Sequence, residues 1–381
     1  MQVSHLGQYW SAERREVRLL AAADVGLDED GSLQGDARDL TDVLPLPRHR
    51  RGFRDAQRGR SWPEVEWTYT GLPFPSLELL EWVESSGRPV AEWLRQGFAA
   101  ADRELSLASL DGAPSDACDH LVCPMVPRRA LAFGVTYLNS ALERETEGKR
   151  RDYAYVYKAV KNRRERPEIF LKGTSPEHFV GPNGKMGLRR DRSNTLGIDG
   201  EPCEALTVSS GIEPELAALV SSRGRIWGYT LADDVSGNRI ENETLLYLAQ
   251  AKFFTGALVL GPVVLLSDEQ DNPQLEITTR IHAADGECLF ERTSQTSRIN
   301  APLHELISWA SSHIALTPGE VLSTGTDVVP DGRVKVLDEG MRVEISCPQI
   351  GCLRHGAAYV PEEGDLNLNY SRLEFESRRE E

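Results

Sequence analysis

The sequence predicts an α+β protein that is mainly β, in which a smaller α/β module precedes a larger β-rich domain. From about residue 126 onward, short apolar runs follow one another with Gly, Asp and Asn between them, which is typical of a strand-rich domain. Within residues 76–107, apolar side chains instead recur at intervals of three and four, which is the period of an amphipathic helix. The chain has 381 residues, which is enough for two domains and for a core without disulfides.

Residues 1–125 are the predicted N-terminal α/β module. Short strands are expected at Val17–Leu20 and at 40–46, with turns rich in Asp and Gly between them. The segment Asp111–Asp119 is rich in Gly, Pro, Ser and Asp, which indicates a linker between the two domains.

Residues 126–360 are the predicted β-rich domain, and residues 361–381 are a charged tail that we expect to fray. Two segments of this domain have helical character, namely 241–252 and 303–312. The expected strands are short, apolar and flanked by turn residues: 130–133, 168–171, 215–220, 226–231, 258–266, 275–281 and 342–346.

The charge balance limits the classes of partner. A formal net charge of -16 argues against bulk binding to nucleic acid or to an anionic membrane, because both require a positive field. An anionic small molecule stays compatible with this charge, since local positive groups or a bound cation can attract it. The polar start of the sequence lacks a signal-peptide pattern, and the longest apolar run, Gly256–Leu266, is too short to span a bilayer. We therefore expect a cytoplasmic protein.

Two acidic patterns follow one another in the β-rich domain. Glu213 and Glu215 are two residues apart at the expected start of a strand, so both side chains project from one face. Asp233 and Asp234 end the next apolar strand. Carboxylates beside apolar runs need a counter-charge, and ligation by oxygen atoms alone suits Mg, Mn or Ca. Taken singly, each pattern is explained as well by solvent-facing acids or by turn caps.

Two further features accompany the acids. Lys252 ends the expected helix 241–252, where a lysine commonly lies on the surface and interacts with the helix dipole. Beside a metal, the same ammonium group would polarise or protonate an enolate oxygen. The turn Thr324–Thr326 offers hydroxyl and backbone N–H donors to a carboxylate, although such turns are common.

In their order and spacing these residues resemble the fumarylacetoacetate hydrolase superfamily, over about residues 132–352. The family's E-x-E pair corresponds to Glu213 and Glu215, and its T-G-T turn to Thr324–Thr326. The family's G-Y-T-x-x-N-D-V-S strand end corresponds to Gly228–Ser236. The family also has a lysine ten residues before the proline of a Gly-Pro pair, and this lysine corresponds to Lys252.

The resemblance implies a rolled, mixed β-sheet and a metal held by Glu213, Glu215 and Asp234. Asp233 stands where the family commonly has asparagine, which leaves open which of the two aspartates binds the metal. Magnesium is the expected ion, with Mn or Ca as alternatives.

Within the superfamily, the chain is most similar to the 2-keto-3-deoxy sugar-acid dehydratases of the keto-deoxy-arabinonate type. The segments 133–137, 166–172 and 242–252 carry this similarity. It implies that Glu168 and Lys252 transfer protons. Glu143 falls at a glutamate position of the hydrolases, and either Glu143 or a relayed proton is expected to help the hydroxyl leave. The hydrolases of the superfamily have a histidine where this chain has Ser140, and the loss of that water-activating base favours a dehydratase.

The resemblance thus implies elimination of water from a small anionic 2-oxo-3-deoxy acid. Phe133, Gly134, Lys172 and Thr326 are the expected substrate-binding residues, and a homodimer is the expected assembly. One alternative is a metal-dependent hydrolase or decarboxylase of an acylpyruvate, and another is a non-catalytic binding protein of the same fold. The segment 195–210 looks inserted before the E-x-E strand, so the exact substrate stays open.

Overall fold

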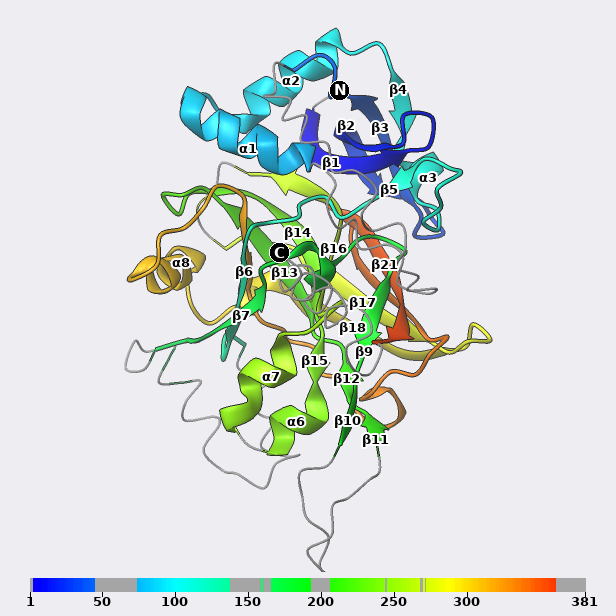
Figure 1. Cartoon of the computed structure of the whole chain (residues 1–381), viewed down its shortest axis with the longest axis vertical. Helices are drawn as coiled ribbons and strands as arrows, with labels where there is room; N and C mark the ends of the chain where they lie inside the picture. Colours follow the sequence, from blue (N-terminus) through cyan, green and yellow to red (C-terminus); the bar gives the residue numbers. More distant parts are fainter. Residues whose placement is uncertain are drawn as a thin grey trace, which may run out of the picture.

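The structure, a computed structural model, describes residues 3–44, 74–137, 158, 160, 166–192, 206–243, 245–267, 270 and 272–360. Its largest element is a 12-stranded sheet in the order β4-β3-β2-β1-β16-β14-β13-β19-β6-β7, with β5 beside β1 and β8 beside β16. Figure 1 shows that the N-terminal strands of this sheet lie at one end of the molecule, under the helices α1 and α2. The strands of this sheet are β1 (Val3–Ser11), β2 (Glu16–Leu27), β3 (Leu33–Asp39), β4 (Glu104–Ser106), β5 (His120–Leu121), β6 (Ala130–Gly134), β7 (Glu168–Gly173), β8 (Phe179–Val180), β13 (Pro214–Val220), β14 (Ile226–Asp234), β16 (Leu258–Leu266) and β19 (Glu320–Ser323).

A second sheet of five strands packs against the first, in the order β18-β17-β20-β21-β9. Its strands are β9 (Lys185–Leu188), β17 (Glu276–His282), β18 (Cys288–Gln295), β20 (Arg342–Cys347) and β21 (Gly351–Tyr359). Two small sheets complete the set: β10 (Arg190–Arg192) with β11 (Leu206–Val208), and β12 (Ser210–Gly211) with β15 (Ser236–Gly237). The pairs β19–β6, β16–β8 and β21–β9 are parallel and the others antiparallel, so both large sheets are mixed, as predicted.

One apolar core lies between the two large sheets. It takes Leu216 and Leu231 from the first sheet and Ile281, Val343 and Leu353 from the second, all of them buried. Because side chains alternate along a strand, β13 and β20 each send every second residue into this core. The expected strands of residues 126–360 are all present, as are both helical segments.

The helices are few and short. They are α1 (Pro75–Ser86), α2 (Val90–Ala100), α3 (Leu107–Leu110), α6 (Asn238–Glu243), α7 (Leu248–Lys252) and α8 (Leu303–Ser311), with 3₁₀ turns η1 (Pro176–His178), η2 (Leu245–Tyr247), η3 (Thr296–Arg298) and η4 (Gly332–Val334). The helical period of 76–107 is divided, because Gly87 ends α1 in the left-handed conformation, with a φ of 70°, and Pro89 precedes α2. The strand expected at 40–46 is wrong over its described part, where residues 41–43 form a turn that follows β3.

The N-terminal strands do not form a sheet of their own. Strand β1 pairs antiparallel with β16 through His5–Leu265 and Leu6–Val264, and Leu6 belongs to the same apolar cluster as Leu258. The division of the chain at residue 125 stays a prediction. The predicted tail at 361–381 lies outside the described residues.

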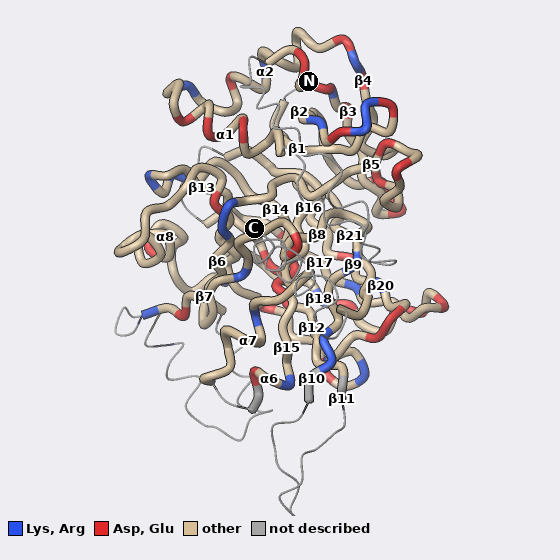
Figure 2. Tube along the Cα trace, in the orientation of Figure 1, with Lys and Arg blue, Asp and Glu red and all other residues tan. Residues whose placement is uncertain are grey.

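Charged side chains of both signs are spread over the molecule. Figure 2 shows Lys and Arg interspersed with Asp and Glu along the described trace. None of the described helices is long and apolar enough to cross a membrane.

Candidate metal centre

Three carboxylates meet where β13 and β14 are paired. One ligand oxygen from each of Glu213, Glu215 and Asp234 lies within 4.8 Å of the other two. The strands are antiparallel neighbours with Glu215 opposite Ala232, so the start of β13 meets the end of β14. The backbone N–H of Asp234 donates a hydrogen bond to the carbonyl of Glu213 at 3.0 Å. Strand pairing therefore brings together side chains that are about twenty positions apart.

The geometry separates the two aspartates. Adjacent residues of a strand point to opposite faces, and Asp234 is the one whose carboxylate joins the two glutamates. Asp233 points the other way, where its Oδ1 accepts a hydrogen bond from the Glu213 backbone N–H at 2.8 Å. Its Oδ2 lies 3.0 Å from Nε2 of His355, and both side chains are fully buried.

Two buried lysines balance most of the negative charge. Nζ of Lys172 lies 2.6 Å from Asp234 Oδ1, and Nζ of Lys252 lies 2.8 Å from Glu213 Oε2. Lys252 is also 3.6 Å from Asp234 Oδ1. Three carboxylates against two ammonium groups leave one net negative charge in a buried site.

Hydroxyl and backbone donors fix the glutamates in place. The Ser323 hydroxyl and the Gly325 N–H both donate to Oε2 of Glu215, the latter at 2.8 Å. The Ser236 hydroxyl donates to Oε1 of Glu213 at 2.8 Å. The Thr-Gly-Thr turn therefore supplies a donor to a metal-site carboxylate. Ser323 received no role from the sequence, because its approach to Glu215 depends on the pairing of β13 with β19.

The ionisation of these groups reflects burial and mutual repulsion. Burial raises the pKa of Glu215 well above its ordinary value, and Asp234 and Glu213 raise that pKa further. Burial also raises the pKa of Asp234, and it lowers the pKa of the Lys172 ammonium group. For Lys252, the neighbouring Asp234 and Glu213 outweigh burial, and the net effect is a raised pKa.

The donor set fits a hard divalent cation. Oδ2 of Asp234 is buried and has no hydrogen-bond partner among the described residues. A buried carboxylate oxygen of this kind needs a partner, and a cation within the triad is one. Three carboxylate oxygens with no thiol or imidazole among them suit Mg or Mn rather than Zn.

A small pocket opens beside the triad. It is lined by residues of β6, β7, α6 and α7 and of the turn after β19, including Phe133, Gly134, Glu168, Glu241 and Lys252. The carboxylate of the half-buried Glu168 lies directly over Gly134, and a Cβ at position 134 would stand 2.2 Å from Glu168 Oε2. Only glycine at position 134 leaves room for this arrangement.

The predicted substrate-binding residues divide into two groups. Phe133, Gly134 and Thr326 line the pocket, and the Thr326 hydroxyl donates to the carbonyl of Pro214 at 2.7 Å. The Lys172 ammonium group is fully buried and contacts Asp234 and the Val235 carbonyl. Glu143 and Ser140 lie outside the described residues. Glu241, which also lines the pocket, received no role from the sequence.

The turn after β6 interlocks with the Thr-Gly-Thr turn. Val135 has a φ of 65°, which is unusual for a β-branched residue and indicates local strain. The Thr136 hydroxyl donates to the Thr324 carbonyl at 2.7 Å, and a Cβ at Gly325 would lie 1.8 Å from that hydroxyl oxygen. The floor of the pocket is therefore built from two mutually fixed loops.

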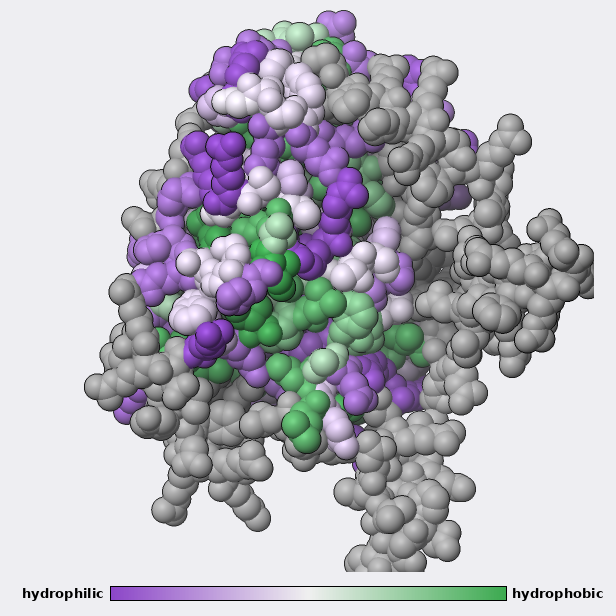
Figure 3. All heavy atoms as spheres, turned by 60° about the vertical axis from the view of Figure 1, so that its left-hand side comes forward, coloured by the Kyte–Doolittle hydropathy of each residue, from purple (hydrophilic) through white to green (hydrophobic). Residues whose placement is uncertain are grey.

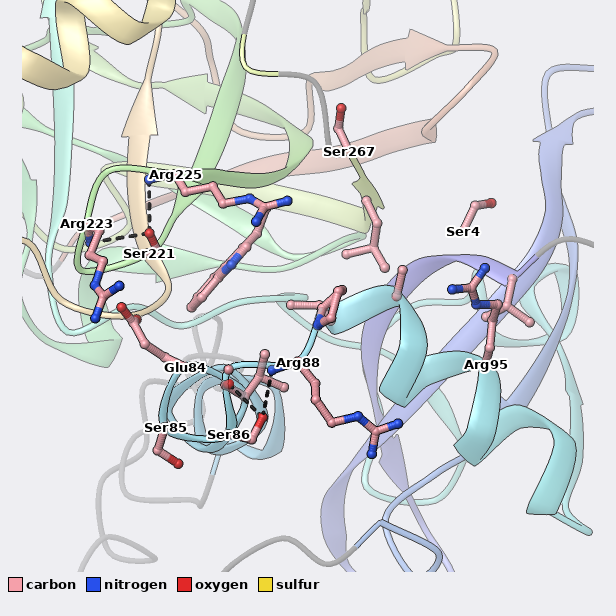
Figure 4. Close-up of a pocket in the computed structure, with 18 residues that line it drawn as sticks. Ser4, Glu84, Ser85, Ser86, Arg88, Arg95, Ser221, Arg223, Arg225 and Ser267 are labelled. Carbon is pink, nitrogen blue, oxygen red and sulfur yellow. Dashed lines mark hydrogen bonds between the residues drawn. The ribbon is translucent and has the colours of Figure 1, made fainter.

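A wider cleft lies elsewhere, between α1, α2 and the hairpin of β13 and β14. Figure 4 shows the arginines that line this cleft directed apart rather than toward one point. Arg88 is paired with Glu92 and stacks over the Trp93 ring at 4.1 Å from its centroid. The cleft contains none of the triad carboxylates, so the chemistry of the site belongs to the smaller pocket.

Sequence comparison agrees with this geometry. The family described as fumarylacetoacetate (FAA) hydrolase C-terminal matches residues 150–357, which is more than half of the chain. The chain belongs to this family.

Two relatives share substantial sequence with the chain. One is 2-dehydro-3-deoxy-D-arabinonate dehydratase of Saccharolobus solfataricus, 36% identical over 237 residues that cover 60% of this chain and 72% of the relative. Another is named probable 2-keto-3-deoxyxylonate dehydratase, of Haloferax volcanii, and is 34% identical over 243 residues, 63% of this chain and 76% of the relative.

Solved structures share the fold. A 2-keto-3-deoxy-D-arabinonate dehydratase complexed with magnesium and 2,5-dioxopentanoate has a TM-score of 0.61 at 23% identity, covering 94% of this chain and 100% of the other. A 2-hydroxyhepta-2,4-diene-1,7-dioate isomerase from Mycobacterium marinum has a TM-score of 0.53 at 19% identity, with coverage of 94% and 100%. The likeness extends over most of the chain.

We expect Glu215→Gln to abolish the stabilisation that Mg²⁺ gives the wild-type protein, because the variant loses a charged ligand. Saturation a hundredfold above the Kd stabilises a folded protein by about 2.7 kcal/mol. Thermal unfolding with and without Mg²⁺ measures this difference. Glu241→Gln, which changes an acid outside the triad, should keep the response to Mg²⁺. An equal response in Glu215→Gln and in the wild type would contradict the predicted role.

The metal-free proteins give a second readout of the same variant. The raised pKa of Glu215 means that the folded state holds this proton more tightly than the unfolded chain does. The free energy of unfolding of the metal-free wild type should therefore fall as the pH rises above 4.5, the ordinary pKa of a glutamate. The free energy of unfolding of Glu215→Gln should fall less over the same range. Urea unfolding at pH 5 and pH 8 in the presence of a chelator checks the sign.

Proposed function

We propose that this protein is a metal-dependent dehydratase that removes water from a 2-oxo-3-deoxy sugar acid. The observation that carries the proposal is a triad of carboxylates, two of them buried, beside a pocket that is also lined by Glu168 and Lys252. Membership of the family and the names of the two relatives support the substrate class. Mg²⁺ is the proposed ion, because the similar solved dehydratase was complexed with magnesium.

Glu213, Glu215 and Asp234 are the residues that would hold the cation. When bound, the cation supplies a Lewis acid that stabilises negative charge on the 2-oxo oxygen of the substrate. Lys172 and Lys252 balance two of the three carboxylates, so the loaded site carries a net positive charge. An anionic 2-oxo acid would bring this charge back to neutral, which favours its entry.

Glu168 is the proposed base. Its carboxylate lies in the pocket, fixed over Gly134, and can accept the C3 proton, which the neighbouring carbonyl makes acidic. The electron pair of that C–H bond forms the C3–C4 double bond as the C4 hydroxyl leaves. The hydroxyl needs one proton to depart as water. Either Glu143 would donate this proton, or Glu168 would relay the proton that it took from C3.

Lys252 is proposed to stabilise the negative charge that develops on the substrate oxygen. Its ammonium group is buried, lies 5.2 Å from the centroid of the Phe170 ring, and keeps its proton because Asp234 and Glu213 raise its pKa. Phe133, Gly134 and Thr326 are proposed to contact the substrate. Lys172 has no access to the pocket, and we propose that it orients Asp234 instead.

We also propose that the protein is a cytoplasmic homodimer. Strand β7 ends the large sheet, and Ile169 on β7 and Trp309 on α8 expose hydrophobic side chains. Figure 3 turns the side of the molecule that carries β7 and α8 toward the viewer, and hydrophobic residues gather on this face. Sedimentation equilibrium should give twice the monomer mass, and a monomer at micromolar concentration would contradict the proposal.

Gly134→Ala should reduce kcat about a hundredfold or more, because the added methyl group displaces the Glu168 carboxylate. The flexible end of Glu168 can move aside, so the variant should fold and bind Mg²⁺ as the wild type does. Steady-state kinetics and Mg²⁺ titration measure the two effects. Gly112→Ala, whose Cβ would meet nothing within 4 Å, is the matched control. A Gly134→Ala variant with wild-type kcat would rule out the proposed position of the base.

Two substrates given separately test the reaction class. A 3-deoxy-2-oxopentonate should lose water in the presence of Mg²⁺, which nuclear magnetic resonance follows directly. An acylpyruvate should keep its diketone absorbance. Loss of absorbance with the acylpyruvate, and no change in the sugar acid, would instead support the hydrolase or decarboxylase alternative.

A further inference from the structure

Asp233, which points away from the metal triad, is paired with His355. Asp233 and His355 are both fully buried, and Asp233 Oδ2 lies 3.0 Å from His355 Nε2. Neither atom has a hydrogen-bond partner elsewhere among the described residues, so each depends on the other. His355 belongs to β21, in the five-stranded sheet, whereas Asp233 ends β14 in the large sheet. The pair is thus a polar contact between the two sheets.

The other oxygen of Asp233 reaches the metal triad through the backbone. The Glu213 N–H donates a hydrogen bond to Asp233 Oδ1 at 2.8 Å. The Asp234 N–H donates a hydrogen bond to the Glu213 carbonyl at 3.0 Å. Both polar groups of the Glu213 backbone are therefore held by the dipeptide Asp233-Asp234. Glu213 immediately precedes β13 rather than lying within it, so the strand ladder alone does not fix its position.

The imidazole is itself fixed on its other side. His355 Nδ1 lies 3.1 Å from the carbonyl oxygen of Gly356, in the same strand. This contact sets the ring plane, and the ring in turn sets the plane of the Asp233 carboxylate. A carboxylate rotated away from this plane would no longer aim Oδ1 at the Glu213 N–H.

We propose that His355 is a positioning residue for the metal centre, acting through Asp233 on the backbone of Glu213. This inference rests on the proposed metal site and adds to it a contact from the second sheet. Neighbours that orient a metal ligand typically change metal affinity by about 10- to 100-fold when they are removed. Because coupling is reciprocal, metal binding should also strengthen the attachment of β21 to the large sheet.

A double-mutant cycle measured by metal affinity tests the proposal. His355→Gln and Asp233→Ala each remove one member of the pair, and each should weaken Mn²⁺ binding about tenfold or more. The Kd of the double variant for Mn²⁺ should be no higher than the higher Kd of the two single variants, because the two residues act as one unit. Calorimetry gives the Kd, and the electron paramagnetic resonance spectrum of bound Mn²⁺ reports the geometry of the site without any turnover.

His5→Gln is the matched control. His5 is also buried, and its Nε2 lies 2.8 Å from the carbonyl oxygen of Gln349, but it has no link to the triad. This variant should lower the free energy of unfolding and leave the Mn²⁺ affinity of the folded protein unchanged. It therefore separates a general loss of stability from a loss of positioning.

The outcomes are distinct. A His355→Gln protein that binds Mn²⁺ within twofold of the wild-type Kd would overturn the positioning role and leave the triad intact. Independent, multiplicative losses in the two single variants would overturn the claim that they act as one unit. A wild-type protein that binds no Mn²⁺ would overturn both this inference and the proposed metal site.

Discussion

The site depends on the close approach of three carboxylates, two of them buried, at the junction of β13 and β14. Isolated charges are costly to bury, so a fold that places three of the same sign together must compensate them nearby. Lys172 and Lys252 compensate two, and serine and backbone donors hold one oxygen of Glu213 and one of Glu215. One negative charge is left over. A divalent cation both removes the repulsion and prepares the site for an anionic substrate.

The rest of the fold holds these groups in place. The carboxylates are attached to β13 and β14 within the large sheet, and the second sheet contacts the opposite face of that sheet, where His355 meets Asp233. Two interlocked turns, one with the strained Val135 and one with Gly325, form the floor of the pocket. A site built on paired strands and fixed turns keeps its groups in position before substrate arrives, which is the requirement for electrostatic stabilisation.

Much of this arrangement follows from local pattern, and the rest from contacts between distant segments. The expected strands of residues 126–360 were predictable, because their apolar runs and their turn residues are local features, whereas β18, β19 and β21 were not among them. The sequence also placed Glu213 and Glu215 on one face. The choice of Asp234 over Asp233 came from the family resemblance, since the period of a strand places the two on opposite faces without saying which face holds the metal.

Other features have no local signal at all. The approach of Glu168 to Gly134 depends on the pairing of β6 with β7 across a long intervening segment. The burial of Lys172 against Asp234, and the pairing of β1 with β16, likewise arise from strand order. Strand order is set by contacts between residues far apart in the chain, so a single sequence read locally does not reveal it.

The claim that the triad holds a divalent cation is tested most directly by X-ray diffraction from crystals soaked in Mn²⁺. We expect an anomalous peak within about 2.0–2.3 Å of carboxylate oxygens from Glu213, Glu215 and Asp234, the range typical of hard cations and oxygen ligands. No peak at the triad, or a peak beside Asp233 and His355 instead, would contradict it.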